Sequence, residues 1–253
     1  MNDTFVRIAA LDFSERDAQV LADHFLDAEA RGKSGHGVVR IPWLWALPGL
    51  DPTARPRLVA EHPGFQYWEG GGAVGYLTLD AVCRAQIEDQ PRPSRLVVAA
   101  DCFPTGVLGY WVRMLAEAGL VAALTATSPA RLSHPDGGPP LAGTNPLAIA
   151  IPSSDGDPIV ADVSMGKATY GDVLEGTATE ADVVPFGGEH AYKAFALALG
   201  LQLLVDSLAG GDHGAVLVVA RPDFDPVPAL RARAPGLRLP GDLPPLRQPP
   251  PGS

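Results

Sequence analysis

Residues 145–164, NPLAIAIPSSDGDPIVADVS, constrain the fold more than any other stretch, because they predict two apolar strands joined by a polar turn at residues 153–157. A connection this short joins antiparallel neighbours, whereas parallel strands need a long crossover. A simple doubly wound parallel sheet is therefore not expected. The sequence instead predicts an α/β fold with a mixed sheet and helices packed on it.

The other predicted elements alternate between strands and helices. Ser14 and Asp17 form a capping-box pattern at the start of the first helix. The segment 192–211 is apolar nearly all round, which predicts a helix deep in the core. Pro42 is expected to end any helical tendency, leaving 41–50 as a connection. Strands are predicted at 64–68, 95–100, 120–127 and 214–223, and helices at 14–32, 76–89, 107–119 and 192–211.

These elements predict one domain over residues 1–221, followed by a tail over 222–253. The tail is rich in proline and ends PPLRQPPPGS. Such a composition favours neither a helix nor a packed core. We therefore expect the tail to be extended or disordered.

Composition excludes several classes of protein. A hydrophobic fraction of 46% is typical of a globular protein with a real core, and no run of eighteen apolar residues predicts a membrane span. The N-terminus lacks the pattern of a signal peptide, so we expect a cytoplasmic protein. A net charge of -10 without a basic run argues against nucleic acid. Cys83 and Cys102 show no metal-binding or disulfide spacing, so no metal site is predicted.

A glycine-rich segment, GGGAVG at 70–75, matches the G-x-G-x-x-G pattern of dinucleotide-binding turns and lies between a predicted strand and helix. Glu69 directly precedes it and disfavours a bound anion. No strand ending in an acidic residue follows at the expected distance. A plain glycine turn is therefore the favoured interpretation.

Two further stretches carry candidate site residues. KSGHGVVRIP at 33–42 contains His36, which titrates near neutral pH, and Arg40, whose planar fork suits a carboxylate. GGPPLAGTNPLAIAIP at 137–152 contains Thr144 and Asn145, which either bind a ligand or cap the turn. On these residues alone, a surface turn and a capped turn are the commoner outcomes.

The combination of motifs changes that balance. ARGKSGHGVVRIPWL, GGPPLAGTNPLAIAIP, VADVS with Asp162, and GGEHAYKAFALALGLQLLVDSLAG occur in this order. Together they resemble the malate/L-lactate dehydrogenase family, which is unrelated to the Rossmann enzymes. The family includes reductases of cyclic imino acids, ureidoglycolate, sulfolactate and diketo-gulonate. The resemblance runs from about residue 5 to residue 220.

The resemblance implies a non-Rossmann α/β fold, a homodimer with the active site between subunits, and NADH or NADPH as cofactor. The implied reaction moves a hydride between nicotinamide and C2 of a small 2-oxo acid, 2-hydroxy acid or cyclic imine. His36 matches the motif histidine that donates a proton or contacts substrate, and Arg40 matches the arginine that holds the substrate carboxylate. The implied cofactor region contains Thr144, Asn145, Ser164 and Lys193.

The chain departs from the family motifs at several positions. Gly35 stands where the motif has serine, with Ser34 one position early, and Pro104 stands where a second motif has histidine. Cys102 replaces the serine of that second motif, and with Ser34 and Asp101 it remains a candidate for the substrate pocket.

The cofactor motifs depart as well. Ser164-Met165-Gly166 replaces an Ala-Thr-Ser segment, and Gly171-Asp172 replaces Gly-Lys. The chain is also shorter than typical members of the family.

Three functions fit these observations. The first is an NAD(P)H-dependent reductase of a small 2-oxo acid or cyclic imino acid. The second is a relative without nicotinamide that uses the carboxylate pocket for cyclisation, isomerisation, elimination or decarboxylation. The third is a non-catalytic homologue. Loss of a proton-transfer histidine is more tolerable for an imine reductase, because a protonated imine needs less acid catalysis than a ketone.

Overall fold

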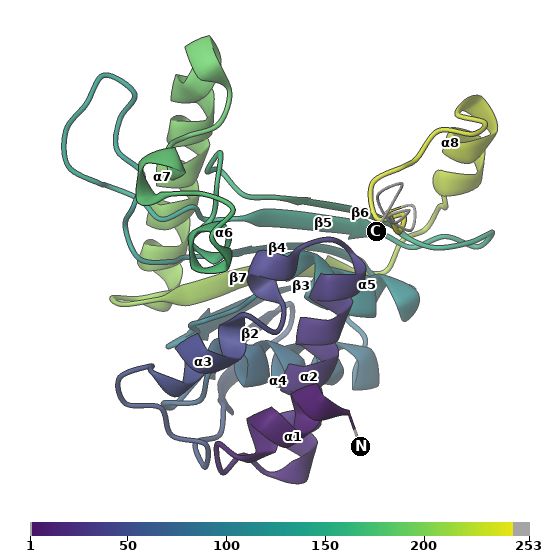
Figure 1. Ribbon diagram of the computed structural model, residues 1–253. Helices are drawn as coiled ribbons and strands as arrows, with labels where there is room; N and C mark the ends of the chain where they lie inside the picture. The colour runs from purple at the N-terminus through teal and green to yellow at the C-terminus, as the bar shows by residue number, and fades with distance from the viewer. Residues whose placement is uncertain (1, 245–253) are drawn as a thin grey trace, which may run out of the picture.

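The computed structural model describes residues 2–244. Within this range a seven-stranded mixed sheet has the order β1-β2-β3-β7-β4-β5-β6, in which β2 and β3 are parallel and all other neighbours antiparallel (Figure 1). The strands are β1 Arg57–His62, β2 Phe65–Glu69, β3 Ser94–Ala100, β4 Val121–Ala126, β5 Leu147–Ile151, β6 Ile159–Val163 and β7 Gly214–Ala220.

Helices cover both faces of this sheet. On one face the main core joins the inward residues of the strands to α2 (Glu15–Ala30), α4 (Gly75–Glu88) and α5 (Leu108–Glu117), with Trp111 of α5 completely buried. The opposite face carries α7 (Ala191–Ala209), whose Val205 packs on Val98 and Val216 in a smaller cluster. Alternate strand residues serve the two cores, as the pleat of a sheet requires.

The predicted elements of the core are present. The expected hairpin is β5 and β6, which pair from Leu147 opposite Val163 to Ile151 opposite Ile159. Ser14 caps α2 by accepting a hydrogen bond from the Asp17 amide. The prediction of a mixed α/β sheet with packed helices is confirmed.

Three expectations about individual segments are wrong. Pro42 does not end a helix, because it lies in the first turn of α3 (Arg40–Trp45), where no intrahelical amide bond is lost. The helix α7 is not deep in the core, since Leu197, Leu203 and Leu204 are each 44–59% exposed.

By length and composition, residues 188–209 could cross a membrane, a property shared with core helices of soluble proteins.

The third wrong expectation concerns the C-terminal segment. A helix, α8 (Val227–Arg233), lies within the predicted tail. The chain then returns to the domain, where Pro240 accepts a hydrogen bond from the Val160 amide and Gly241 accepts one from the Arg31 guanidinium. The predicted disorder is therefore wrong for this part, and residues 245–253 lie outside the described range. The sequence also gave no signal for α1 (Asp3–Ala9), β1 or α6 (Tyr170–Glu175).

Candidate active site

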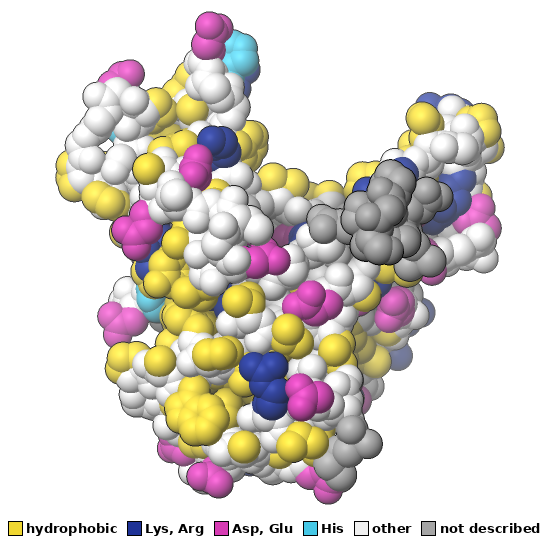
Figure 2. Space-filling view, in the orientation of Figure 1, with side chains coloured by type: hydrophobic (Ala, Val, Ile, Leu, Met, Phe, Trp, Pro, Cys, Tyr) yellow, Lys and Arg dark blue, Asp and Glu magenta, His cyan; other side chains and the backbone are white. Residues whose placement is uncertain are grey.

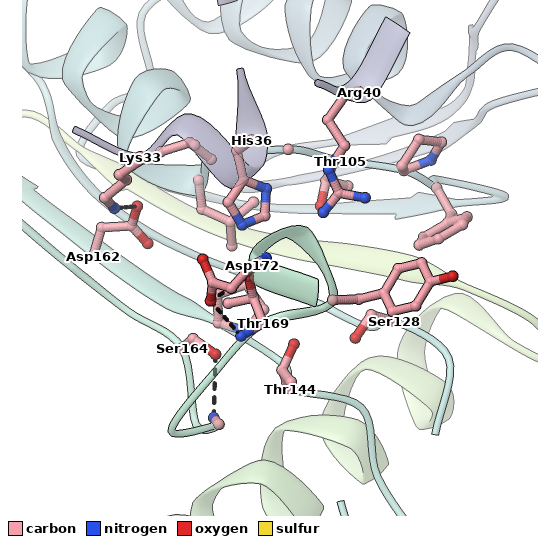
Figure 3. Close-up of a pocket in the computed structure, with 18 of the residues that line it drawn as sticks. Lys33, His36, Arg40, Thr105, Ser128, Thr144, Asp162, Ser164, Thr169 and Asp172 are labelled. Carbon is pink, nitrogen blue, oxygen red and sulfur yellow. Dashed lines mark hydrogen bonds and ion pairs between the residues drawn. The ribbon is translucent and has the colours of Figure 1, made fainter. Parts of the chain in front are cut away.

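A cavity of about 650 Å³ lies at one end of the sheet. Because β4, β5 and β6 are antiparallel, the end of β4, the start of β5 and the end of β6 meet at the same edge. The loop after β3 reaches this edge too, and the segment between α2 and α3 completes the wall together with α6 (Figure 3). The wall is formed by parts of segments 32–43, 103–108, 127–131, 144–146 and 162–172, together with Tyr76.

Arg40 is a buried cation at the cavity wall. Only 7% of the residue is exposed, its Nε donates to the Gly35 carbonyl at 2.8 Å, and its guanidinium lies 4.9 Å from the ring centre of Trp43. It forms no ion pair within residues 2–244. Burial lowers the pKa of Arg40, but a guanidinium stays charged. A buried cation lacking an acidic partner is suited to an anionic ligand.

His36 lies beside Arg40 at the wall, in the short 3₁₀ turn Ser34–His36. Its buried Nδ1 has no hydrogen-bond partner among the described residues. Burial, followed by the charges of Arg40, His24 and Lys33, lowers the pKa of His36 well below its usual value. The imidazole is therefore neutral at pH 7 and can offer either a hydrogen bond or a proton acceptor.

Lys33 and Asp162 form an ion pair in the same wall, where the Lys33 Nζ donates to the Asp162 carboxylate (Figure 3). The Asp162 side chain is only 10% exposed. It lies against the first turn of α5, since a Cβ added at Gly109 would be 2.9 Å from Asp162 Oδ2. The Lys33 ammonium and the first turn of α5 therefore both face the Asp162 carboxylate.

The backbones of two glycines, Gly35 and Gly171, lie against each other beside the cavity. A Cβ at Gly35 would lie 2.7 Å from the Gly171 carbonyl carbon, and a Cβ at Gly171 would lie 2.3 Å from the Gly35 oxygen. The backbone of α6 can therefore rest directly on the turn that carries His36. The glycine at position 35, which departs from the motif serine, is required by this close approach.

Asp172, at a position where the resemblance implies a lysine, has a local structural role. Its carboxylate accepts hydrogen bonds from the Thr169 amide at 2.6 Å and from the Thr169 hydroxyl at 3.0 Å. These bonds complete a capping box at the start of α6. Asp172 thus fixes the helix that covers the site.

The remaining wall offers groups suited to a phosphate-bearing cofactor. Hydroxyls come from Ser128, Thr144 and Ser164, whereas the Thr127 hydroxyl is bonded to the Gly214 backbone. The Arg131 guanidinium lies 3.9 Å from the ring centre of Tyr170 and, like Arg40, has no acidic partner in the described chain. Hydroxyls and free guanidinium groups are typical partners of phosphate oxygens. The residues present therefore fit a nicotinamide dinucleotide.

Of the predicted site residues, the structure brings His36, Arg40, Thr144 and Ser164 to the cavity. Asn145 does not reach it, because its fully buried amide accepts from the Ser128 amide and donates to the Ala198 carbonyl and the Gln202 side chain. Asn145 therefore anchors α7 to the loop before β5.

The other candidates also lie away from the cavity. Lys193 is exposed on α7, and Ser34 sits in the turn behind His36 without lining the cavity. The Asp101 carboxylate accepts from the Gly72 amide at 2.6 Å, which accounts for the glycine-rich turn without a phosphate. Cys102 is a fully buried thiol that contacts the Gly75 carbonyl. Pro104 does line the cavity, at the position of the motif histidine.

Several wall residues were missed by the sequence analysis, among them Lys33, Tyr76, Arg131 and Tyr170. The first motif implied by the resemblance has the form RGxxSHGxxRLPxY. It leaves the position of Lys33 variable, so the motif itself does not mark this residue. Arg131 and Tyr170 come from different segments and meet only in the folded chain. Asp162 lies within one of the motifs that carry the resemblance. Its carboxylate was the one feature of the sequence that could have marked it as a site residue.

Comparison with known proteins decides the family. The sequence model described as malate/L-lactate dehydrogenase matches residues 4–183. The chain belongs to this family. A Δ1-pyrroline-2-carboxylate/Δ1-piperideine-2-carboxylate reductase of Pseudomonas putida is 29% identical over 78% of this chain and 66% of its own length. A malate dehydrogenase of Pyrococcus horikoshii is 26% identical over 80% of this chain and 64% of its own length.

Other relatives extend the range of substrates in their names. A (2R)-3-sulfolactate dehydrogenase (NADP(+)) of Chromohalobacter salexigens is 29% identical over 78% of this chain and 67% of its own length. The solved structure of a dehydrogenase from Sinorhizobium meliloti has a TM-score of 0.83 at 22% identity and covers 94% of this chain and 86% of that one. The chain thus spans about two thirds of the curated relatives it matches.

The glycine contact can be tested by substitution. We expect Gly171→Ala to lower the free energy of unfolding by about 1–3 kcal/mol, because its methyl group would overlap the Gly35 carbonyl. Chemical denaturation measures the change. The matched control is Gly211→Ala, where an added Cβ meets nothing within 4 Å and we expect a change within about 0.5 kcal/mol. Equal stability of the two variants would contradict the close contact.

Proposed function

We propose that this protein is an NAD(P)H-dependent reductase of a small carboxylate whose C2 carries an oxo or cyclic imino group. The observation that carries the proposal is Arg40, a buried guanidinium without an acidic partner in the described chain, at the wall of a cavity that also holds His36. The relatives support it, since their names are those of dehydrogenases and reductases of hydroxy and imino acids.

In this mechanism Arg40 binds the substrate carboxylate through its free guanidinium nitrogens. The Gly35 carbonyl and the Trp43 ring hold the fork in place before substrate arrives, which lowers the cost of ordering it. Neutral His36 accepts or donates one hydrogen bond at the oxo or imino group. The close approach of Gly35 and Gly171 holds α6 against the turn that carries His36.

The cofactor would lie along the hydroxyls of Ser128, Thr144 and Ser164, with Arg131 at its phosphate groups. When bound, reduced nicotinamide supplies the hydride that reaches C2 of the substrate.

Nicotinamide binding tests the proposal directly. We expect NADPH or NADH at millimolar concentration to raise the melting temperature of the purified protein, because a ligand that binds only the folded state stabilises it. ATP at the same concentration is the control for nonspecific nucleotide binding. The absence of a shift with both reduced cofactors would overturn the reductase and favour the cofactor-free or non-catalytic alternatives.

Carboxylate binding tests the role of Arg40. We expect Arg40→Met to weaken binding of oxamate, a small unreactive carboxylate, by about 10- to 100-fold, because charge-assisted hydrogen bonds contribute about 1.5–3 kcal/mol. Arg40→Lys keeps the charge without the planar fork and should fall between wild type and Arg40→Met. Calorimetric titration measures the affinity, and Arg57→Met, in an exposed pair with Glu69, serves as the surface control. Unchanged affinity in Arg40→Met would remove the carboxylate assignment.

A homodimer is part of the same proposal. Leu197, Leu204 and Leu208 are exposed on α7 and, at positions i, i+7 and i+11, lie along one side of the helix. They form an apolar face suited to a second copy of the chain. Figure 2 shows apolar side chains gathered in the region of α7.

The oligomeric state in solution tests the proposed homodimer. We expect light scattering to give a dimer for wild type and a monomer for Leu204→Glu, because the substitution would bury a charge in the interface. Leu58→Glu changes a leucine of similar exposure on β1 (41% against 44% for Leu204) and should leave the dimer intact. A monomeric wild type at micromolar concentration would contradict the proposal.

A further inference from the structure

Reduction of a 2-oxo acid needs a proton as well as a hydride, and the cavity has few groups that can provide one. His36 is neutral, because burial lowers its pKa, and Pro104 has no ionisable group. Burial raises the pKa of Tyr76 to about 12, which makes its hydroxyl a weaker acid than an ordinary tyrosine. Arg40 and Arg131 keep their protons. A proton source is therefore missing from the residues that the motifs mark.

Lys33 is suited to donate this proton, because it lies at the cavity wall and its side chain is an ammonium group. Its side chain enters the cavity wall beside the His36 imidazole, and its ammonium is held by the Asp162 carboxylate (Figure 3). The second lysine at the wall, Lys167, is 64% exposed and is paired with Asp182 on an exposed turn. The Lys33 side chain is 38% exposed, so it lies at the wall with part of its length open to solvent.

We propose that Lys33 is the catalytic acid of this protein, giving a proton from its Nζ to the carbonyl oxygen of a 2-oxo acid bound at Arg40. This inference rests on the proposed reductase function. It assigns the acid to a residue at a variable position of the first motif, and it leaves His36 as a hydrogen-bonding contact to the substrate.

The step balances as follows. The hydride forms a C–H bond at C2, the carbon–oxygen π pair becomes a lone pair on oxygen, and that oxygen takes one proton from the Lys33 ammonium. The product is a 2-hydroxy acid, and Lys33 is left as a neutral amine that regains its proton from water. Asp162 positions the ammonium through the ion pair and neither gives nor takes a proton in this step.

A cyclic imine gives the discriminating comparison, because its protonated nitrogen already carries the proton that the product needs. The substrates are pyruvate, oxaloacetate and sulfopyruvate as 2-oxo acids and Δ1-piperideine-2-carboxylate as the imine. We expect Lys33→Met to lower kcat for the 2-oxo acids by about 100-fold or more, in the range of general acid catalysis. Reduction of the imine should change by less than about fivefold.

Lys33→Arg separates proton donation from charge. Arginine keeps a cation beside Asp162 but does not release its proton at neutral pH. We expect this variant to lose 2-oxo acid reduction as Lys33→Met does, while its thermal shift with NADPH or NADH stays that of wild type. It also keeps the partner of the buried Asp162, so it tests the proposal even where Lys33→Met fails to fold. Full 2-oxo acid activity in Lys33→Arg would overturn the proposal.

A readout without turnover is available, because the chain has only three lysines, at 33, 167 and 193. With ¹³C-labelled lysine, we expect oxamate to shift the side-chain signal that disappears in Lys33→Arg and to leave that of Lys193 unchanged. A Lys33 signal that does not respond to bound oxamate would contradict contact with the substrate.

The two proposals fail in different ways. A wild type that binds no reduced nicotinamide and reduces none of the four substrates overturns the reductase and the Lys33 assignment together. A wild type that reduces the imine but no 2-oxo acid overturns the Lys33 assignment alone and leaves the reductase standing.

Discussion

The contact between the Gly35 and Gly171 backbones is the constraint on which the site depends. It allows α6 to lie directly on the turn that carries His36, and it leaves the Gly35 carbonyl in place to hold the Arg40 guanidinium. Side chains at either position would push the two segments apart. The cavity therefore depends on the close approach of these two backbones. Asp172 lies in α6, which begins with a capping box, and Arg40 lies in the first turn of α3.

The charges of the cavity are unevenly compensated. Lys33 and Asp162 neutralise each other, and Asp172 is bound by Thr169, whereas Arg40 has no acidic partner in the described chain. Buried charges are stabilised when they are paired, so a free guanidinium at a cavity wall indicates a role toward a ligand. This difference in pairing is the basis for proposing Arg40 as the residue that binds the carboxylate and Lys33 as the proton donor.

Departures from the family motifs have structural meaning here. Gly35 permits the approach of α6, and Asp172 caps that helix, so two apparent losses belong to one local arrangement. Pro104 lines the cavity without any proton to give. The proposed proton donor, Lys33, lies at the cavity wall with Asp162 as its partner.

The sequence by itself determined the mixed sheet, the β5–β6 hairpin, the capped α2 and the family, because these depend on local periodicity, short turns and ordered motifs. It also placed His36 and Arg40 in one segment. Tertiary structure decided which candidates face the cavity, since Asn145, Asp101 and Cys102 are bound by distant backbone groups. It alone paired Lys33 with Asp162, residues 129 positions apart, because contacts between separate segments form only when the sheet brings the strand ends to one edge.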